Sequence, residues 1–238
     1  MRNPGTNAIF TGFLSLLLCL MVVPAAAQDA GDIKESMEHA RDEARESTET
    51  LNEFMSDPSK SIPRALLRRA EAIAVFTNIK KGGFIIGGTG GDGVISRRTG
   101  NSWSLPAFYD VGGADVGFQI GAKQTDYILV FMTPTALKDL LDDEVELSAG
   151  LGIAAGPVGD TAAVTTGKVD NVYVYSNSGG AFAGATIGGG SIKANNSINE
   201  AIYKMKAGAF LRDPKQAKTS GLPSELRNFS NTIAKYAK

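Results

Sequence analysis

Apolar residues recur at intervals of three and four between residues 33 and 55, which is the spacing of one face of an α-helix. The apolar face is thin, because Ala40 and Ala44 bury little surface. Asp57-Pro58 ends the segment, since proline disfavours helical geometry in the residue before it. The pattern therefore predicts a peripheral helix that is exposed or packs lightly on the rest of the chain.

A second, shorter helix is expected at residues 62–72, because Ser61 can cap it and Pro63 fits its first turn. After this helix the spacing of apolar residues changes from that of a helix to that of strands. The clearest alternation follows Gly112-Gly113, and the continuous apolar run Tyr127 to Met132 predicts a strand buried on both faces. Strands are expected at 73–76, 84–89, 94–97, 114–122, 127–132, 147–156, 172–175 and 181–192.

Further helices are expected in one internal connection and at the C-terminus. Thr133-Pro134 starts a helix through Leu141, Ser197 and Glu200 form a capping box, and a last helix begins near Pro223. Glycine repeats on one strand face, which implies tight curvature. The fold class is therefore α+β, with antiparallel, curved or barrel-like glycine-rich sheet and helices at the N-terminus, in one internal connection and at the C-terminus.

The first residues have the pattern of a cleaved signal peptide. An apolar run over residues 9–23 is followed by Pro24 and by Ala25-Ala26-Ala27, so that the mature chain would start at Gln28. An uncleaved anchor is the alternative, and Cys19 lacks the small residues that precede a lipidated cysteine. We expect a signal peptide at 1–27, an acidic amphipathic helix at 28–57 and one domain at 58–238, located in the periplasm or secreted.

The charges are nearly balanced overall, with 24 Lys and Arg against 25 Asp and Glu, which argues against general binding to nucleic acid. They are unevenly distributed, however. Six bases lie in residues 58–81 and nine in residues 193–238, on either side of an acidic middle segment. Such asymmetry is typical of a partner surface or of solvated helix faces.

The residues that usually carry catalysis are scarce. His39 is the only histidine, and a chain starting at Gln28 has no cysteine, so serine and cysteine triads lack their usual base. Zinc sites of the common cysteine/histidine kind are excluded by composition. We expect His39 to be a surface residue, and we expect no catalytic residue, no cofactor and no metal.

Two further motifs are weak. Residues 88–93 match the glycine pattern of a dinucleotide-binding loop, but Val94-Ile95-Ser96 continues as a strand and supplies no helix N-terminus, so we interpret the glycines as a turn. Residues 142–146 are acidic but lack the ligand alternation of a calcium loop, which favours a solvated connection.

The remaining candidate is a group of bases that could contact an anionic headgroup, each contributing about 1 kcal/mol near such a surface. The alternative is that they balance the acidic first helix. The group consists of Arg64, Arg68, Arg69, Lys80 and Lys81.

Several ordered motifs over residues 60–205 resemble the SYLF domain family. They are Ile62-Pro63, Ala70-Glu71-Ala72-Ile73-Ala74-Val75-Phe76, Lys80-Lys81-Gly82-Gly83-Phe84, Gly91-Asp92-Gly93-Val94, Trp103-Ser104-Leu105-Pro106-Ala107-Phe108-Tyr109, Gly117-Phe118-Gln119-Ile120-Gly121-Ala122, Gly156-Pro157-Val158-Gly159, Phe182-Ala183-Gly184 and Asn199-Glu200-Ala201-Ile202-Tyr203.

The resemblance implies a lipid-binding module, since eukaryotic members bind phosphoinositides and some bind actin. The acidic first helix departs from a membrane-binding helix with a basic polar face, which moves the expected contact to the five bases. The expected function is a non-enzymatic periplasmic binding module for anionic phospholipid or a membrane surface. A structural or protein-interaction factor of the cell envelope is the alternative.

Overall fold

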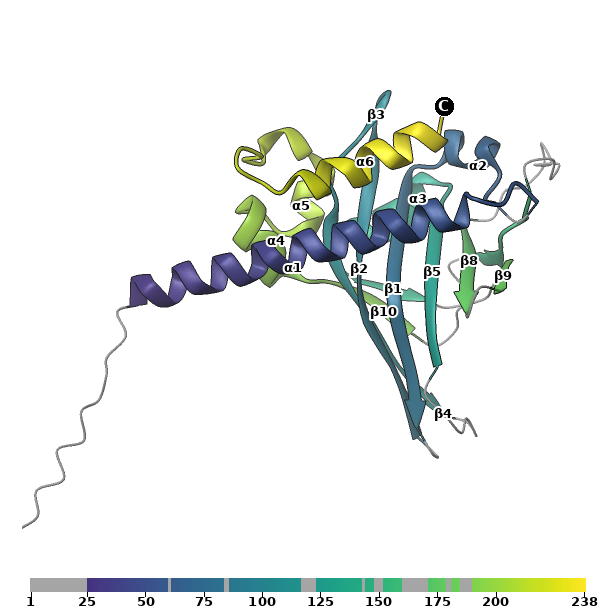
Figure 1. Cartoon of the computed structure of the whole chain (residues 1–238), viewed down its shortest axis with the longest axis horizontal. Helices are drawn as coiled ribbons and strands as arrows, with labels where there is room; N and C mark the ends of the chain where they lie inside the picture. Colours follow the sequence, from purple (N-terminus) through teal and green to yellow (C-terminus); the bar gives the residue numbers. More distant parts are fainter. Residues whose placement is uncertain are drawn as a thin grey trace, which may run out of the picture.

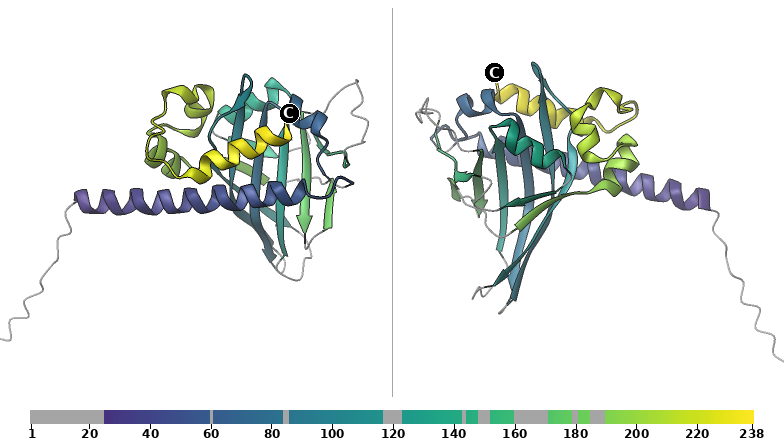
Figure 2. Two further views of the ribbon diagram at one scale, coloured as in Figure 1. Left: turned by 45° about the horizontal axis from the view of Figure 1, so that its top comes forward. Right: turned by 180° about the vertical axis from the view of Figure 1, so that it is seen from behind.

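One curled sheet forms the middle of the molecule, and helices lie along both of its sides (Figures 1 and 2). In Figure 1 helices α1 and α6 cross in front of the strands, while α3 lies behind them and comes to the front in the reverse view of Figure 2. This computed structural model describes residues 25–59, 61–83, 86–116, 123–142, 144–147, 152–159, 171–178, 181–184 and 190–238.

The strands follow the order β6-β10-β4-β2-β1-β5-β8-β7, with β3 paired to β2 and β9 paired to β8. The described pairs are antiparallel except β7 with β8, which is parallel. The predicted fold class is confirmed, and the parallel pair makes the sheet mixed. The bounds are β1 Ala72–Gly83, β2 Ile86–Thr99, β3 Ser102–Trp103, β4 Ala107–Val116, β5 Lys123–Phe131, β6 Glu144–Leu147, β7 Ile153–Ala155, β8 Val172–Ser178, β9 Ala181–Gly184 and β10 Gly190–Ala194.

The helices occupy the predicted places, and α5 is an addition that the sequence did not indicate. Thr133 caps α3 as expected, because its Oγ1 accepts a hydrogen bond from the backbone N–H of Ala136 (3.3 Å). The cap of α4 is Asn195 and not Ser197, and Pro63 rather than Ser61 precedes α2. The bounds are α1 Ala25–Phe54, α2 Arg64–Arg69, α3 Pro134–Leu141, α4 Asn196–Tyr203, α5 Ala207–Arg212, the 3-10 turn η2 Pro214–Gln216 and α6 Ser224–Tyr236.

Helix α1 is a structural element of the core, so the prediction of a lightly packed peripheral helix is wrong. Ala40, Ala44 and Leu51 are completely buried, and the helix contacts α4, α6, β1 and β2. The alanines that made the apolar face look thin allow the helix backbone to approach its neighbours closely. The N-terminal part of the helix extends well past the strands (Figure 1).

The central strands β1 and β5 are covered on both faces, as the apolar run in β5 predicted. Ile128 to Phe131 have no exposed surface, and Ala72 to Phe76 are equally inaccessible. Consecutive strand residues point to opposite faces, so this burial requires a layer on each side of the sheet. The helices in front and the curl of the sheet behind supply these layers.

Strand β2 is continuous from Ile86 to Thr99, so the interpretation of residues 88–93 as a turn is wrong. The glycines meet a β-bulge in β1, where the register shifts between Phe76 and Lys80. A Cβ atom on Gly91 would lie 2.5 Å from Cδ1 of Ile79, so no larger residue fits opposite the bulge without movement. The glycines thus accommodate side chains of the neighbouring strand.

Parts of the predictions fall outside the described residues. These are residues 1–24 of the predicted signal peptide, including Cys19, residues 117–122 of the alternating strand, residue 143 of the acidic segment, and residues 84–85, 148–151 and 185–189 of three other predicted strands. Residues 25–27, the end of the predicted signal peptide, belong to α1. Among the described residues, no helix combines the length and apolar character needed to span a bilayer.

We predict that Leu51→Ala lowers the free energy of unfolding by about 2–5 kcal/mol, because a large-to-small change at a fully buried position leaves a cavity. Chemical denaturation followed by circular dichroism measures the change. Glu49→Ala, on the exposed side of the same helix, is the matched control and should cost less than about 1 kcal/mol. Equal effects of the two substitutions would show that α1 does not belong to the core.

Candidate functional site

The two cationic segments of the sequence meet at one end of the molecule. Helix α2 contacts α6, and Arg68 donates a hydrogen bond from Nη1 to the main-chain oxygen of Lys238 (3.0 Å). The ring of Tyr236 lies between two cations, 5.6 Å from the guanidinium carbon of Arg64 and 4.8 Å from Nζ of Lys235. We call Arg64, Arg68, Arg69, Lys235 and Lys238 the α2–α6 cation cluster.

The position of this cluster is fixed by buried residues beneath it. Leu66 and Leu67 anchor α2 in the core, which leaves its arginines exposed. Arg98 of β2 then binds the C-terminal end of α2, donating from Nε to the Ala70 oxygen (2.7 Å) and from Nη2 to the Leu67 oxygen (2.6 Å). The Arg98 guanidinium carbon also lies 4.4 Å from the centre of the Trp103 ring, and its burial lowers its pKa.

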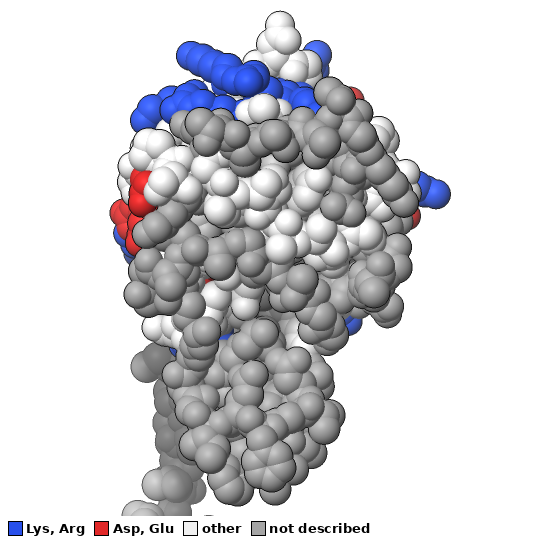
Figure 3. All heavy atoms as spheres, turned by 90° about the vertical axis from the view of Figure 1, so that its right-hand side faces the viewer, with Lys and Arg blue, Asp and Glu red and all other residues white. Residues whose placement is uncertain are grey.

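Among the described residues, the cluster has no Asp or Glu paired with it, and its one described contact with an anionic or carbonyl oxygen is that of Arg68 with the main-chain oxygen of Lys238. All five side chains belong to exposed residues, and among the described residues none of them forms an ion pair with an Asp or Glu carboxylate. Viewed from the end at which α2 lies, Lys and Arg atoms gather along the top edge of the surface (Figure 3). An uncompensated positive surface of this kind attracts anions.

Two of the five predicted bases lie elsewhere. Lys80 and Lys81 belong to the far half of β1, where they pair with Gln124 and Lys123 of β5. Eight residues of strand separate Ala72, just after α2, from Lys80, which is about 26 Å at about 3.3 Å per residue. The structure therefore does not place the predicted bases on one surface: it groups Arg64, Arg68 and Arg69, and leaves the two lysines apart.

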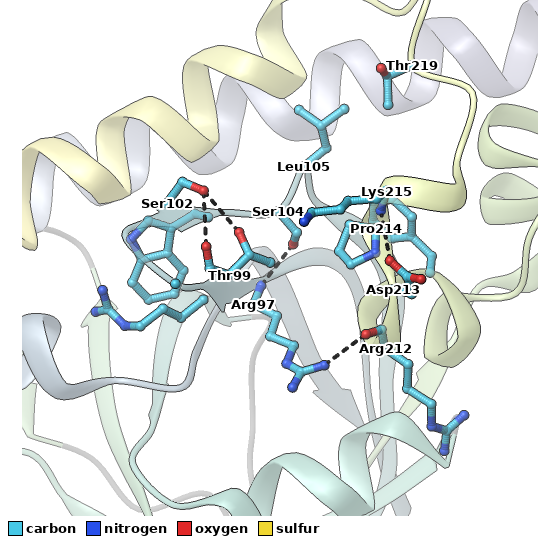
Figure 4. A pocket seen from close by; sticks show the side chains of 14 residues that line it. Arg97, Thr99, Ser102, Ser104, Leu105, Arg212, Asp213, Pro214, Lys215 and Thr219 are labelled. Atoms are coloured by element: carbon cyan, nitrogen blue, oxygen red, sulfur yellow. Dashed lines mark hydrogen bonds between the residues drawn. The ribbon is translucent and has the colours of Figure 1, made fainter.

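A pocket of about 830 Å³ opens beside this end, between the β2–β3 hairpin and the segment after α5. Thr99 and Ser102 line one wall, and Asp213 and Lys215 come from the other (Figure 4). Further lining residues include Arg97, Arg98, Trp103 and Arg212.

Most of the cations in this pocket are already engaged. Arg97 donates from Nη1 to the main-chain oxygen of Leu211 (2.9 Å), although its buried Nε has no hydrogen-bond partner. Arg98 binds the end of α2, and Arg212 forms an ion pair with Asp142 (2.7 Å). The pocket is therefore less attractive to an anion than its composition suggests, and the α2–α6 cation cluster is the stronger candidate.

A second polar group lies where α1 packs on β1 and β2. His39 is half-exposed on that helix, and its Nε2 is 3.6 Å from Oδ2 of Asp92 on β2. Glu43, one turn further along the helix, is buried and accepts a long hydrogen bond from Thr77 Oγ1 (3.4 Å). One nitrogen or oxygen atom from each of His39, Glu43 and Asp92 lies within 4.8 Å of the others, a spacing from which a metal ion could be held.

Burial and neighbouring charge shift two carboxyl groups of this region. Burial, followed by the charges of Asp92 and Glu46, raises the pKa of Glu43 to about 8. Burial also raises the pKa of Asp110, which the hydrogen bond from Asn195 opposes. The His39 side chain is 40% exposed, in agreement with the prediction of a surface residue. The prediction did not include its contact with Asp92 or its proximity to buried Glu43.

The fold defines an α+β domain with a curled mixed sheet, and the comparison with known proteins gives its family. The chain belongs to the Ysc84 family: the sequence model described as "Ysc84: Las17-binding protein actin regulator" matches residues 112–236, more than half of the chain. The resemblance to the SYLF family is thereby confirmed.

Similar proteins include Protein YSC84 of Saccharomyces cerevisiae, which is 32% identical over 148 residues that cover 60% of this chain and 31% of the relative. LAS seventeen-binding protein 3 of the same yeast is 33% identical over 148 residues, covering 60% and 32%. SH3 domain-containing YSC84-like protein 1 of Homo sapiens is 27% identical over 172 residues, covering 68% and 50%. The chain thus spans about a third to a half of these relatives.

Sequence reasoning missed Lys235 and Lys238 as partners of the α2 arginines. The excess of bases in residues 193–238 was the available signal, but nothing in a linear pattern shows that α6 ends beside α2. It also missed the group around His39, because Asp92 lies far along the chain and inside the glycine-rich strand.

We predict that the protein loses stability as the pH rises from about 4.5 to 8, because folded Glu43 keeps a proton that the unfolded chain releases. The loss attributable to this group is up to about 5 kcal/mol, because its pKa differs by about 3.5 between the unfolded and the folded protein. Unfolding free energies measured against pH in EDTA-containing buffer check this. The charged or polar groups near Glu43 that can influence its protonation are His39, Glu46, Thr77, Asp92 and Asp110.

Glu43→Gln should flatten the profile over this range, since the amide carries no proton to lose. The exposed substitution Glu49→Gln on the same helix should leave the profile unchanged. A Glu43→Gln protein with the full wild-type slope would show that another group titrates.

Proposed function

We propose that this chain is a non-enzymatic module that binds anionic phospholipid surfaces through the α2–α6 cation cluster. The observation that carries the proposal is the meeting of five exposed cations, from two segments far apart in sequence, without an Asp or Glu carboxylate paired to them among the described residues. The two lysines of β1 are not part of the proposed contact.

The magnitude is sufficient for reversible membrane binding. At about 1 kcal/mol for each cation near an anionic surface, five cations supply about 5 kcal/mol, or a several-thousand-fold preference over a neutral surface. Arg98 ties α2 to the sheet, so the cations need little ordering when they meet a surface. Binding that depends on exposed charge weakens as salt shortens the range of the interaction.

The proposed location is the periplasm, or the outside of the cell, after removal of residues 1–27. In that compartment the ligand would be an anionic phospholipid of the envelope, such as phosphatidylglycerol, whose headgroup phosphate carries the charge that the cluster attracts.

We predict that the purified protein sediments with vesicles that contain phosphatidylglycerol and not with pure phosphatidylcholine vesicles. Arg69→Glu combined with Lys235→Glu should lower the apparent affinity for these vesicles at least tenfold. Addition of 300 mM salt should lower the apparent affinity of the wild type by a similar factor. These two side chains are chosen because they make no described hydrogen bond, so the fold is expected to survive.

Lys80→Glu combined with Lys206→Glu is the matched control, because it changes the net charge equally at exposed positions outside the cluster. This control should bind as the wild type does. An equal loss of vesicle binding in both double variants would show that only the net charge matters and not the position of the cations. Binding to neutral vesicles would contradict the electrostatic basis of the proposal.

We also predict that the exported protein begins at Gln28, which N-terminal sequencing or intact-mass measurement of the fractionated protein checks. Ala27→Leu should block processing, because the peptidase requires a small residue before the cleavage site. A mature protein that retains residues 1–27 would instead indicate an uncleaved anchor.

A protein partner is the second candidate, favoured by the description of the family and by the name of one yeast relative, LAS seventeen-binding protein 3, which refer to binding of Las17. The surface available for it is the overhanging N-terminal part of α1, where Asp32 to Glu35 are exposed. Recovery of one stoichiometric envelope protein by crosslinking, abolished by deleting residues 28–36 and with vesicle binding retained, would support this function.

A further inference from the structure

The β1 bulge brings three elements together around His39. At the bulge Asn78 adopts a left-handed backbone conformation (φ 53°), and Thr77 and Asn78 contact Glu43 and Glu46 of α1. Asp92 lies in the part of β2 that faces the bulge. The fold therefore directs the helix face that carries His39 and Glu43 toward a carboxylate of the sheet.

The negative charge at this place is high and poorly compensated. Asp92 is directly opposite Asp110 of β4 in the antiparallel register, an arrangement of like charges that destabilises a sheet. Asn195 orients Asp110 with a hydrogen bond from Nδ2 (2.9 Å). His39 is the only basic side chain with a described contact to Asp92.

Glu43 gives a second and independent indication of a cation. Its residue is 7% exposed, and its one described hydrogen bond, from Thr77, is 3.4 Å long. A carboxyl group buried with so little hydrogen bonding keeps its proton unless a cation compensates the charge of the ionised form, so a cation bound here would be held by an otherwise unsatisfied carboxylate. No Lys or Arg of the described residues is paired with it.

We propose that His39, Glu43 and Asp92 form a binding site for a divalent first-row transition metal ion, with Zn²⁺ as the preferred occupant. Residues four apart on a helix share a face, so His39 and Glu43 can contribute to the same ion, and Asp92 closes the site from the sheet. Asp110 adds negative charge beside it.

The ligand chemistry selects this class of ion. Imidazole nitrogen suits Zn²⁺ and its neighbours, whereas Ca²⁺ and Mg²⁺ prefer six or more oxygen ligands. Zinc bonds of about 2.1 Å place tetrahedral ligands about 3.4 Å apart. Nε2 of His39 and Oδ2 of Asp92 are already 3.6 Å apart, and the widest separation among the three ligand atoms, at most 4.8 Å, must contract by up to about 1.4 Å. His39 and Asp92 can make this adjustment because their side chains are 40% and 53% exposed, while buried Glu43 is the fixed member.

The experiment uses protein prepared without a histidine tag and freed of metal with EDTA. Titration with Co²⁺ alone should produce d–d absorption bands in the visible range with one equivalent bound, and Zn²⁺ should displace it. Ca²⁺ and Mg²⁺ at millimolar concentration should not. Because His39 is the only histidine, its single imidazole signal in a ¹H–¹⁵N NMR spectrum should shift on addition of one equivalent of Zn²⁺.

Glu43→Gln and Asp92→Asn should each weaken Zn²⁺ affinity at least tenfold. Glu38→Gln is the matched control, since it makes the same chemical change at an exposed position next to His39 and should leave affinity unchanged. Glu43→Gln replaces a buried carboxyl group by an uncharged amide of similar shape and should fold at least as well as the wild type, which separates lost binding from lost structure.

Three results would overturn the proposal. The imidazole signal could stay unchanged on addition of Zn²⁺, which would show that His39 contacts Asp92 without taking part in a metal site. Binding could survive both substitutions, which would place the metal elsewhere, or Ca²⁺ could compete at low concentration, which would assign an oxygen-type site. Vesicle binding is measured separately, so failure of the lipid proposal and failure of this one are distinguishable.

Discussion

The close contact between α1 and the bulged β1–β2 ribbon is the constraint on which the rest of the structure depends. Ala40 and Ala44 let the helix approach closely, and the glycines of β2 leave room for the side chains of Phe76 and Ile79 on the neighbouring strand. This contact covers one face of the central strands and supports α6, which packs beside α1. The same contact buries the carboxyl group of Glu43. The packing that stabilises the fold therefore also determines the protonation of this group.

The sequence predicted the elements whose signal is local. The continuous apolar run of β5 and the stripe of α6 each reflect burial along a single element, and both hold in the structure. The errors concern tertiary contact. Small residues such as Ala44 look like a weak helix face until a neighbour packs against them, and the glycines of residues 88–93 resemble a turn although they serve a strand beside a bulge.

The candidate site was half predictable for the same reason. The arginines of α2 were identified from charge alone, and the lysines near Tyr236 were not, because their proximity arises from the packing of α6 on α1 and α2. Lys80 was included because it is near in sequence, but an extended strand carries successive residues away from one another. Charge composition thus indicates that a cationic surface exists, whereas only the topology determines which cations share it.

The antiparallel ribbon of β1 and β2 is long, and it leads directly away from α2. A protein held against a surface by its α2 end would present the opposite end of this ribbon, with Lys80, about 26 Å further out at the rise of an extended strand. Residues 72–77 of β1 and 93–96 of β2, in the half of the ribbon nearer α2, are buried and fix that half in the core. The course of β1 thereby keeps Lys80 apart from the cations of α2, so the two cannot contact the same small patch of a surface.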